Sequence, residues 1–201
     1  GRRPHGRVLD IGCGAGDLLF QLARRGYTGM GVEPSPPAHA EAVRRLSAVK
    51  NRVTLVERLE QAEGLFDWVI ACEVLEHIED DRAALREWAA RLTSEGRLLL
   101  SIPAFRRRWG ADDEWAGHFR RYERRDLQER ISEVGLKMEA LWCYGFPLGL
   151  LLEAVSCFLH RRQLKREKPM SPAERTALSG VDRLRLIRRL AFLSQPALLL
   201  P

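Results

Sequence analysis

Residues 8–16 constrain the fold of this chain more than any other segment. They read Val-Leu-Asp-Ile-Gly-Cys-Gly-Ala-Gly, an apolar run that contains Asp10 and ends in three glycines spaced two apart. A helix-like apolar pattern follows at once over residues 18–23. A strand, a glycine turn and a helix in this order predict the first β-to-α turn of a doubly wound sheet, where nucleotide-like ligands bind.

The glycine spacing discriminates between ligands. Gly12, Gly14 and Gly16 follow Gly-x-Gly-x-Gly, whereas a dinucleotide turn has Gly-x-Gly-x-x-Gly and aims a helix N-terminus at a pyrophosphate. Asp10 would repel a pyrophosphate but can accept hydrogen bonds from a cationic amine. A second predicted strand, residues 27–32, ends at Glu33, where an acidic side chain meets ribose hydroxyls. Glycines that only supply positive φ for a bend are the alternative, and the two acids favour a nucleoside site.

This segment resembles motif I of the class I S-adenosylmethionine (SAM) methyltransferases. The resemblance implies that family's Rossmann-like fold and SAM as the methyl donor. Many relatives place an Asp for the adenine amino group after the third strand, whereas this chain has Glu57-Arg58-Leu59-Glu60-Gln61, so Glu60 is the expected substitute. The implied cofactor-binding set is Asp10, Gly12, Cys13, Gly14, Gly16, Glu33, Glu60 and Cys72.

The rest of the chain alternates strand and helix patterns. Further strands are expected at 52–56, 66–72, 97–102 and 136–144, and helices at 36–48, 80–92 and 126–134. This alternation predicts an α/β fold with a mostly parallel sheet. The methyltransferase fold adds an antiparallel seventh strand, for which the sequence has no good candidate. We expect a SAM-binding domain over residues 1–145 and an apolar, basic, helical extension over residues 146–201. Either this extension takes the place of the seventh strand, or that strand lies beyond residue 201.

Polar residues follow the expected fourth strand, at the edge where α/β sheets bind ligands. Phe-Asp-x-Val followed by Glu-Val-Leu-Glu-His resembles motif II and its sequel in the methyltransferase group that includes ubiquinone-biosynthesis enzymes. In a helical turn Glu73, Glu76 and His77 would share one face. Two carboxylates and an imidazole suit Mg²⁺, Mn²⁺ or Zn²⁺.

A second histidine, His118, lies in a polar and aromatic segment, residues 109–122, that we expect to be a loop of the substrate pocket. A Glu-x-x-Glu-His set completed by a distant histidine resembles the metal centre of small-RNA 2′-O-methyltransferases and ubiquinone-pathway O-methyltransferases. That resemblance implies the ligands Glu73, Glu76, His77 and His118. In metal-free relatives such a histidine is a general base or only caps the loop, and all three roles stay open. His77 and His118 are the candidate catalytic residues, because an imidazole can accept a hydroxyl proton.

Two arginines follow His118 directly. Arg120 and Arg121 either hold a phosphate or carboxylate of the acceptor or are solvated. The run Gly-His-x-Arg-Arg-Tyr resembles bacterial SAM methyltransferases that act on small molecules, some of them lipid- or sugar-linked.

Charge is concentrated near the C-terminus. Ten Lys or Arg and three acids lie between residues 161 and 189, a net charge of +7, whereas the whole chain carries +6. Apolar segments flank this stretch, a pattern that resembles a surface for an anionic membrane or a lipid-linked substrate. The alternative is a solvated helix face whose leucines pack on the domain. Nucleic-acid binding is disfavoured because few aromatic residues interleave the basic ones.

Three functions are compatible with the sequence. The first is SAM-dependent O-methylation of a small-molecule or lipid-linked acceptor. The second is RNA methylation using the basic extension, and the third is a domain that binds SAM without turnover. The four cysteines show no Cys-x-x-Cys pairing and the chain has no uncharged apolar run of about 18 residues. We therefore expect no disulfide framework and a cytoplasmic location, with peripheral membrane contact through the extension as a further expectation.

Overall fold

The computed structural model describes residues 6–144, 148–164, 170–172 and 174–176 of the 201-residue chain. Its centre is a sheet of five parallel strands: β1 (Arg7–Ile11), β2 (Thr28–Val32), β3 (Val53–Val56), β4 (Phe66–Cys72) and β5 (Leu92–Ser101). The strand order is β3-β2-β1-β4-β5. The chain adds strands outward from β1 on one side and then returns to its other side with β4. This reversal makes a topological switch point beside β1, the place where open α/β sheets bind ligands.

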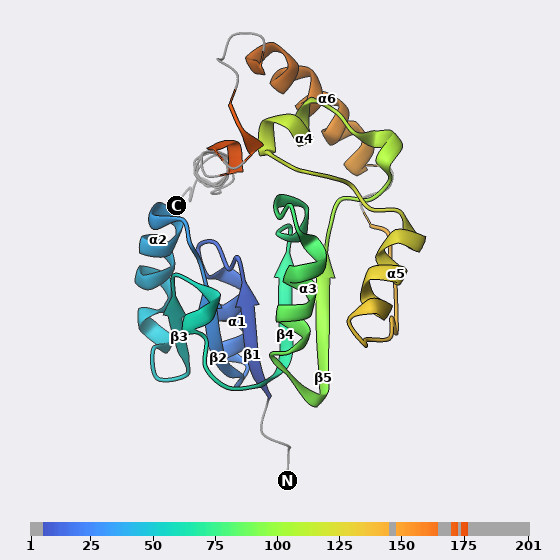
Figure 1. The fold of residues 1–201 in the computed structure, drawn as a ribbon. Coiled ribbons are helices and arrows are strands. Elements are labelled where there is room, and N and C mark those ends of the chain that lie inside the picture. The colour runs from blue at the N-terminus through green and yellow to red at the C-terminus, as the bar shows by residue number, and fades with distance from the viewer. Residues whose placement is uncertain (1–5, 145–147, 165–169, 173, 177–201) are drawn as a thin grey trace, which may run out of the picture.

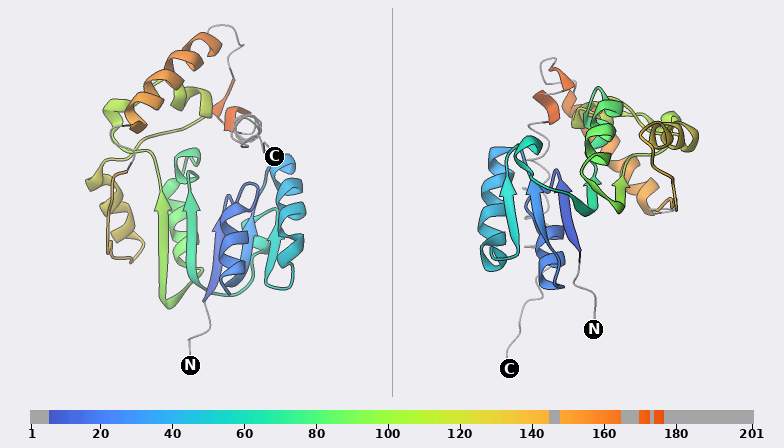
Figure 2. Two further views of the ribbon diagram at one scale, coloured as in Figure 1. Left: turned by 180° about the vertical axis from the view of Figure 1, so that it is seen from behind. Right: turned by 60° about the horizontal axis from the view of Figure 1, so that its bottom comes forward.

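The named α-helices of the described residues are α1 (Asp17–Arg24), α2 (Pro36–Leu46), α3 (Asp81–Ala89), α4 (Ala111–Ala116), α5 (Arg124–Glu133) and α6 (Leu148–Leu164). Helix α2 starts with a proline pair, whose fixed φ suits a first turn. Helix α3 starts where the Asp80 carboxylate accepts a hydrogen bond from Ala83 N at 2.9 Å. The ribbon shows α4 and α6 beyond the carboxyl ends of the strands (Figure 1 and the left view of Figure 2).

Two apolar clusters hold these layers together. One gathers residues of β1, β4, α3 and α5, including Leu9, Leu85 and Trp88, and the other joins α1, α2 and β3. All residues of β1 from Val8 to Ile11 are buried, as expected for a parallel strand covered on both faces. The prediction of a doubly wound, mostly parallel sheet is therefore confirmed, and among the described strands all neighbours are parallel.

The predicted sixth strand, residues 136–144, is wrong, because no strand forms there. Side chains of the segment still contact side chains of β5. Arg97 Nε lies 3.1 Å from Glu139 Oε2, and the hydroxyls of Ser101 and Tyr144 are 2.7 Å apart. Its alternating pattern is real, since Leu136 and Met138 pack against the core. A strand also needs backbone hydrogen bonds to an adjacent strand, however. The local sequence does not show whether another strand lies close enough to form them.

The largest boundary differences lie between α3 and β5. Helix α3 ends at Ala89 rather than at residue 92, and β5 begins at Leu92 rather than at residue 97. Gly96 lies inside β5, where the pairing with β4 shifts register between Phe66 and Trp68. The segment 109–122, expected to be a loop, contains the short helix α4.

Helix α6, in the described part of the C-terminal extension, docks on α4. Ser156 Oγ donates to Asp112 Oδ1 at 3.0 Å, and the rings of His160 and Trp115 stack with centroids 4.1 Å apart. The proposed division between residues 1–145 and 146–201 falls at residues outside the described ranges and stays a prediction, as does any structure for residues 177–201. Among the described helices, none is both long and apolar enough to cross a membrane.

Candidate functional site

The site residues predicted from sequence gather at the carboxyl edge of the sheet. The glycine turn follows β1, Glu33 follows β2, Glu60 lies in a 3₁₀ turn after β3, and Cys72 ends β4. Helix α4 and the segment around His118 follow β5 and lie beyond the same edge (Figure 1). The parallel topology therefore brings together segments that are far apart in the sequence.

The glycine turn bends sharply across the end of β2. The backbone N–H groups of Gly12 and Cys13 both donate to Val32 O, at 2.9 and 3.0 Å. Gly12, Gly14 and Gly16 all have positive φ, a conformation that costs glycine little. A Cβ on Gly12 would lie 2.6 Å from Val74 Cγ2, whereas a Cβ on Gly14 would meet nothing within 4 Å. The turn therefore packs closely on the post-β4 segment while leaving open space at Gly14.

Asp10 is a buried acid near the carboxyl end of β1. Its side chain is almost fully covered, and its Oδ2 has no hydrogen-bond partner among the described residues. Burial, with a smaller contribution from the charge of Glu33, raises the pKa of Asp10 to about 7. Burial, followed by the charge of Asp10, also raises the pKa of the Cys13 and Cys72 thiols, which stay neutral. An acid held in this way favours a cationic ligand.

Glu33, just after β2, holds the glycine turn through a hydrogen bond. Its Oε2 accepts a hydrogen bond from Gly14 N at 2.8 Å, and its Oε1 accepts one from Ser35 N at 2.8 Å. These bonds use one lone pair of each carboxylate oxygen and leave acceptor capacity for a hydroxyl. The side chain of Glu60 is exposed, in keeping with its place on a turn at the rim.

Glu76, His77 and His118 form a compact group. One ring nitrogen of each histidine and a carboxylate oxygen of Glu76 all lie within 4.8 Å of one another. The Glu76 side chain is fully buried, and its Oε1 is 3.9 Å from His118 Nε2. The two imidazoles meet edge to face, with ring centroids 4.6 Å apart. The structure thus brings together three of the four residues that the sequence suggested as metal ligands.

Glu73 is not part of this group. Its Oε1 accepts a hydrogen bond from Ser101 Oγ at 2.6 Å, and its backbone N–H donates to Ser101 O at 2.8 Å. The expected single helical face fails because Glu73 has a φ of 56° and the 3₁₀ turn covers only Leu75–His77. Glu73 is therefore directed toward β5.

His118 is held by a buried carboxylate that the sequence reasoning missed. Asp113 Oδ1 lies 2.9 Å from His118 Nδ1, and Asp113 also accepts hydrogen bonds from Arg121 Nε and Gly110 N. Burial alone would raise the pKa of Asp113, but hydrogen bonds from His118, Arg121 and Gly110 outweigh it and the pKa lies below the usual range. An ionised Asp113 makes His118 Nδ1 the donor, so the lone pair is on Nε2, which has no hydrogen-bond partner among the described residues.

The expectations for the two arginines need correction. Arg121 is not solvated, because it is buried and its Nε pairs with Asp113. Arg120 Nη1 pairs with Asp81 at 2.7 Å, and Asp81 also receives Arg130 Nε at 2.8 Å and the Tyr122 hydroxyl at 3.0 Å. Burial alone would raise the pKa of Asp81, yet the hydrogen bonds and positive charges around it outweigh burial and lower it. Two buried carboxylates therefore anchor the segment that carries His118. The acids and arginines within that segment were the only sequence signal for these ion pairs. Their spacing does not show which acid pairs with which arginine.

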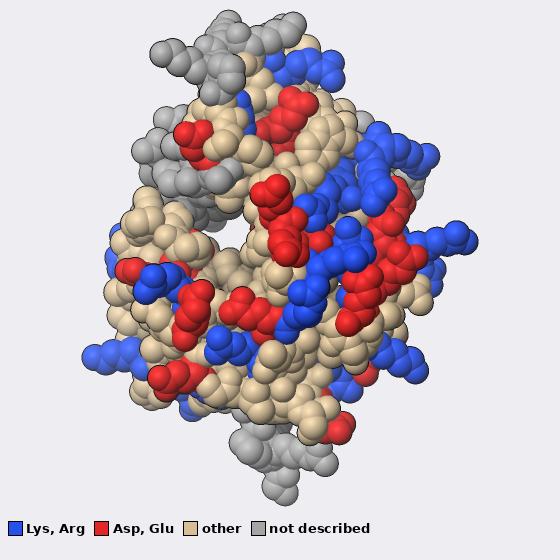
Figure 3. Space-filling view, viewed as in Figure 1, with Lys and Arg blue, Asp and Glu red and all other residues tan. Residues whose placement is uncertain are grey.

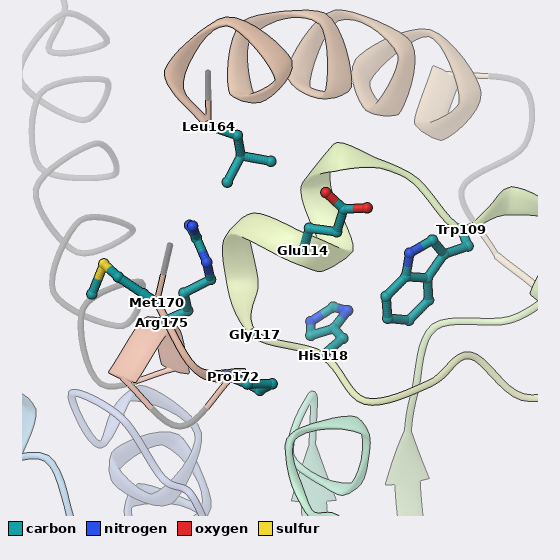
Figure 4. Close-up of a pocket in the computed structure, with 8 residues that line it drawn as sticks. All are labelled: Trp109, Glu114, Gly117, His118, Leu164, Met170, Pro172 and Arg175. Carbon is teal, nitrogen blue, oxygen red and sulfur yellow. The ribbon is translucent and has the colours of Figure 1, made fainter. Parts of the chain in front are cut away.

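A cavity of about 350 Å³ adjoins His118. Figure 4 shows it between the α4 segment, α6 and the chain after α6. The lining residues are Trp109, Glu114, Gly117, His118, Leu164, Met170, Pro172 and Arg175. Apolar side chains make up much of this wall, and the volume is in the range of small-molecule sites.

The surface around these elements carries mixed charge. On the face seen in Figure 3, basic side chains gather in a diagonal band over the right half, and acidic side chains flank this band on both sides. Among the described residues that line the cavity, Arg175 is the single permanent cation, and Glu114 carries the opposite charge.

The chain matches a family model described as a methyltransferase domain over residues 2–141. It is 40% identical over 107 residues to a ubiquinone biosynthesis O-methyltransferase from Bradyrhizobium diazoefficiens, a match that covers 51% of this chain and 41% of the relative. A protein with the same description from Aeromonas salmonicida is 37% identical over 100 residues and is matched over 42% of its length. The chain thus spans about two fifths of these relatives.

Solved structures show the same fold. A magnesium protoporphyrin IX methyltransferase from Synechocystis PCC 6803 with bound SAH has a TM-score of 0.57 and 26% identity, over 68% of this chain and 67% of that one. A putative methyltransferase from Bacillus halodurans C-125 has a TM-score of 0.62 at 18% identity, over 71% of this chain and 67% of its own, and supports the fold alone.

Asp10 makes folding pH-dependent. Its pKa is about 7 in the folded chain, against 3.8 for an exposed aspartate. As the pH rises, the unfolded chain loses this proton first, so the folded state loses stability progressively between these two pH values. We expect Asp10→Asn to be more stable than the parent at pH 8 by roughly 2–4 kcal/mol, and the difference to shrink toward pH 4. Urea unfolding from pH 5 to 8 measures it. Asp67→Asn, an exposed site at the amino end of β4, is the control, and identical pH profiles for Asp10→Asn and the parent would contradict the prediction.

Proposed function

The chain belongs to the methyltransferase-domain family, and from this premise we propose that it transfers the methyl group of SAM to a hydroxyl of a small-molecule acceptor. The observation that carries the proposal is the buried Asp10 oxygen without a partner, next to the open space at Gly14. The names of the matched relatives support O-methylation, and the SAH-bound structural neighbour supports SAM as the donor.

The residues at the glycine turn fit this donor. SAM, when bound, supplies an electrophilic methyl group on a sulfonium. Asp10 would accept hydrogen bonds from the cationic amine, which would favour its ionised form and lower its pKa from about 7. Glu33 has remaining lone pairs for ribose hydroxyls while it holds the turn through Gly14 N. Glu60 and Cys72 complete the proposed set at the rim of the sheet.

His118 is the proposed general base. Asp113 accepts a hydrogen bond from its Nδ1–H, so the imidazole presents the Nε2 lone pair. A hydroxyl nucleophile must lose its proton as the new bond to carbon forms, and a fixed imidazole can accept that proton. Arg121 keeps Asp113 ionised and in place. Asp113 and Arg121 therefore act on the reaction through His118.

Binding and turnover test this assignment separately. We expect the parent chain to bind SAM in calorimetry and Asp10→Asn to lose most of that binding, while Asp67→Asn retains it. His118→Asn should keep SAM binding but lower methyl transfer to catechol, followed with labelled SAM, by about 10²–10⁴-fold, the usual contribution of a general base. Full turnover in His118→Asn with intact SAM binding would remove His118 from catalysis, and a parent chain that binds no SAM would overturn the proposal as a whole.

The same group of side chains supports a second arrangement, a divalent metal site. Two imidazoles and a carboxylate within 4.8 Å are a common metal-ligating set. Metal-ligating histidines usually donate their other N–H to a carboxylate, as His118 does to Asp113. Glu76, His77 and His118 would hold the ion, and two nitrogen ligands favour Zn²⁺ or Mn²⁺ over Mg²⁺. The ion would supply positive charge that favours the acceptor alkoxide.

Metal titration distinguishes the two arrangements. If a metal is bound, Glu76→Gln and His118→Asn should each lower the affinity for Zn²⁺ or Mn²⁺ by at least tenfold in calorimetry. Glu73→Gln is the matched control and should retain binding, because the Glu73 carboxylate is hydrogen-bonded to Ser101. An affinity that is the same in the parent and in His118→Asn would rule out this metal site and leave the metal-free base.

We also propose that the extension contacts a membrane surface or a lipid-linked acceptor. Val155, Phe158 and Leu159 are spaced to share one face of α6 and are 60%, 56% and 57% exposed. Trp142 and Tyr144 are still more exposed. Apolar side chains beside a basic segment are typical of interfacial helices.

Vesicle sedimentation tests the membrane contact. We expect the full chain to bind vesicles of phosphatidylserine and phosphatidylcholine better than pure phosphatidylcholine, because the basic segment is attracted to anionic lipid. The triple variant Val155→Ser, Phe158→Ser, Leu159→Ser should bind roughly tenfold more weakly. Leu65→Ser, which changes another exposed apolar side chain just before β4, should not. Equal binding by the triple variant would contradict a role for α6.

RNA methylation has less support. An RNA site needs basic side chains along the substrate path, but the cavity beside His118 combines one arginine with an acid and several apolar residues among its described lining. A domain that binds SAM without turnover is also disfavoured, because Asp113, His118 and Arg121 form a buried network suited to proton transfer.

A further inference from the structure

The described part of the C-terminal extension reaches the histidine pair. Thr176 Oγ1 lies 3.0 Å from His77 Nδ1, although the two residues are 99 positions apart in the sequence. The same hydroxyl lies 3.0 Å from Pro172 O, 3.3 Å from Gly117 O and 3.5 Å from Ala116 O. Thr176 therefore connects the extension to both segments that carry the candidate catalytic histidines.

The carbonyl oxygens around this hydroxyl favour one direction for its bond to His77. A threonine hydroxyl has one proton and two lone pairs. Carbonyl oxygens can only accept, so directing the proton to one of them avoids placing both hydroxyl lone pairs against carbonyl oxygens. A lone pair then faces His77 Nδ1, which makes Nδ1 the donor. In a neutral imidazole the other nitrogen, Nε2, then has the lone pair.

We propose that Thr176 is a positioning residue of the site, which holds His77 in the Nδ1–H tautomer through its hydroxyl. Asp113 holds His118 in the same tautomer. Both imidazoles then offer Nε2, whether the pair serves proton transfer or a metal. The consequence for catalysis rests on the proposed function, whereas the tautomer itself does not.

Gly117 gives independent support for this contact. It ends α4 with a φ of 77°, and a Cβ there would lie 2.2 Å from Pro172 O and 2.8 Å from Thr176 Oγ1. Only a glycine therefore lets the extension approach the His118 segment this closely. Gly117 thus lets Thr176 lie between the segment that carries His118 and the side chain of His77.

The extension also forms part of the cavity wall. Met170, Pro172 and Arg175 line it together with His118 and Trp109. The segment that positions His77 is therefore the one that would contact an acceptor. Changes in residues 170–176 are expected to affect acceptor selection as well as the histidine pair.

Nitrogen NMR of the imidazole rings tests the proposal without SAM or acceptor. The full chain is labelled with ¹⁵N-histidine and studied at about pH 8, above the imidazole range, and the His77 signals are assigned from their absence in His77→Gln. We expect a protonated Nδ1 and an unprotonated Nε2 for His77 in the parent. Thr176→Val keeps the shape but removes the hydroxyl and should shift the tautomer ratio toward Nε2–H by about fivefold, the equivalent of one hydrogen bond.

Two further variants and one control complete the test. Thr176→Ser restores the hydroxyl and should restore the parent spectrum, whereas Gly117→Ala should reproduce the Thr176→Val spectrum by blocking the approach. Thr54→Val removes the hydroxyl of an exposed threonine on β3 and should change nothing. A His77 pattern that is the same in the parent and Thr176→Val would overturn the proposal. Because SAM binding is measured separately, a failure of the proposed function would be recognised by itself.

Discussion

The structure depends on a strand that is buried on both faces and still carries an acid. Residues of β1 pack into the centre of the sheet, and Asp10 lies among them with an oxygen that has no partner among the described residues. Burying a carboxyl in this way is unfavourable, as its pKa of about 7 shows. The unfavourable burial leaves an acceptor in place for a cationic ligand at the switch point of the sheet. Stability and binding are thus opposed at one residue.

Beyond the sheet, ionised carboxylates position the chain where secondary structure is sparse. Asp81 pairs with Arg120, Arg130 and the Tyr122 hydroxyl. Asp113 pairs with His118 and Arg121. Each is buried and pairs with at least two donor side chains, which makes removal of one partner costly. These two networks fix a segment that contains only the short helix α4. His118 consequently has a defined tautomer and orientation although it is outside any helix or strand.

The periodic parts of the chain were predictable and the irregular parts were not. The five strands and the glycine turn were predicted from apolar runs bounded by glycine and other turn residues. A parallel strand that is buried on both faces has such a continuous apolar run. The segment 136–144 carries a strand pattern but lacks backbone pairing, which depends on a distant neighbour. Likewise Glu73 and Glu76 look equivalent in sequence, yet a left-handed φ at Glu73 sends their carboxylates in different directions.

The sequence by itself determined the doubly wound sheet, the glycine turn with Asp10 and Glu33, and the two histidines as candidates, because these depend on local spacing and chain order. Only the tertiary structure decided that Asp113 supports His118, that Arg120 and Arg121 are anchors, and that Thr176 of the extension contacts His77. The physical reason is that a buried polar group requires a partner, and the partner is chosen by proximity in the folded chain rather than by distance along it.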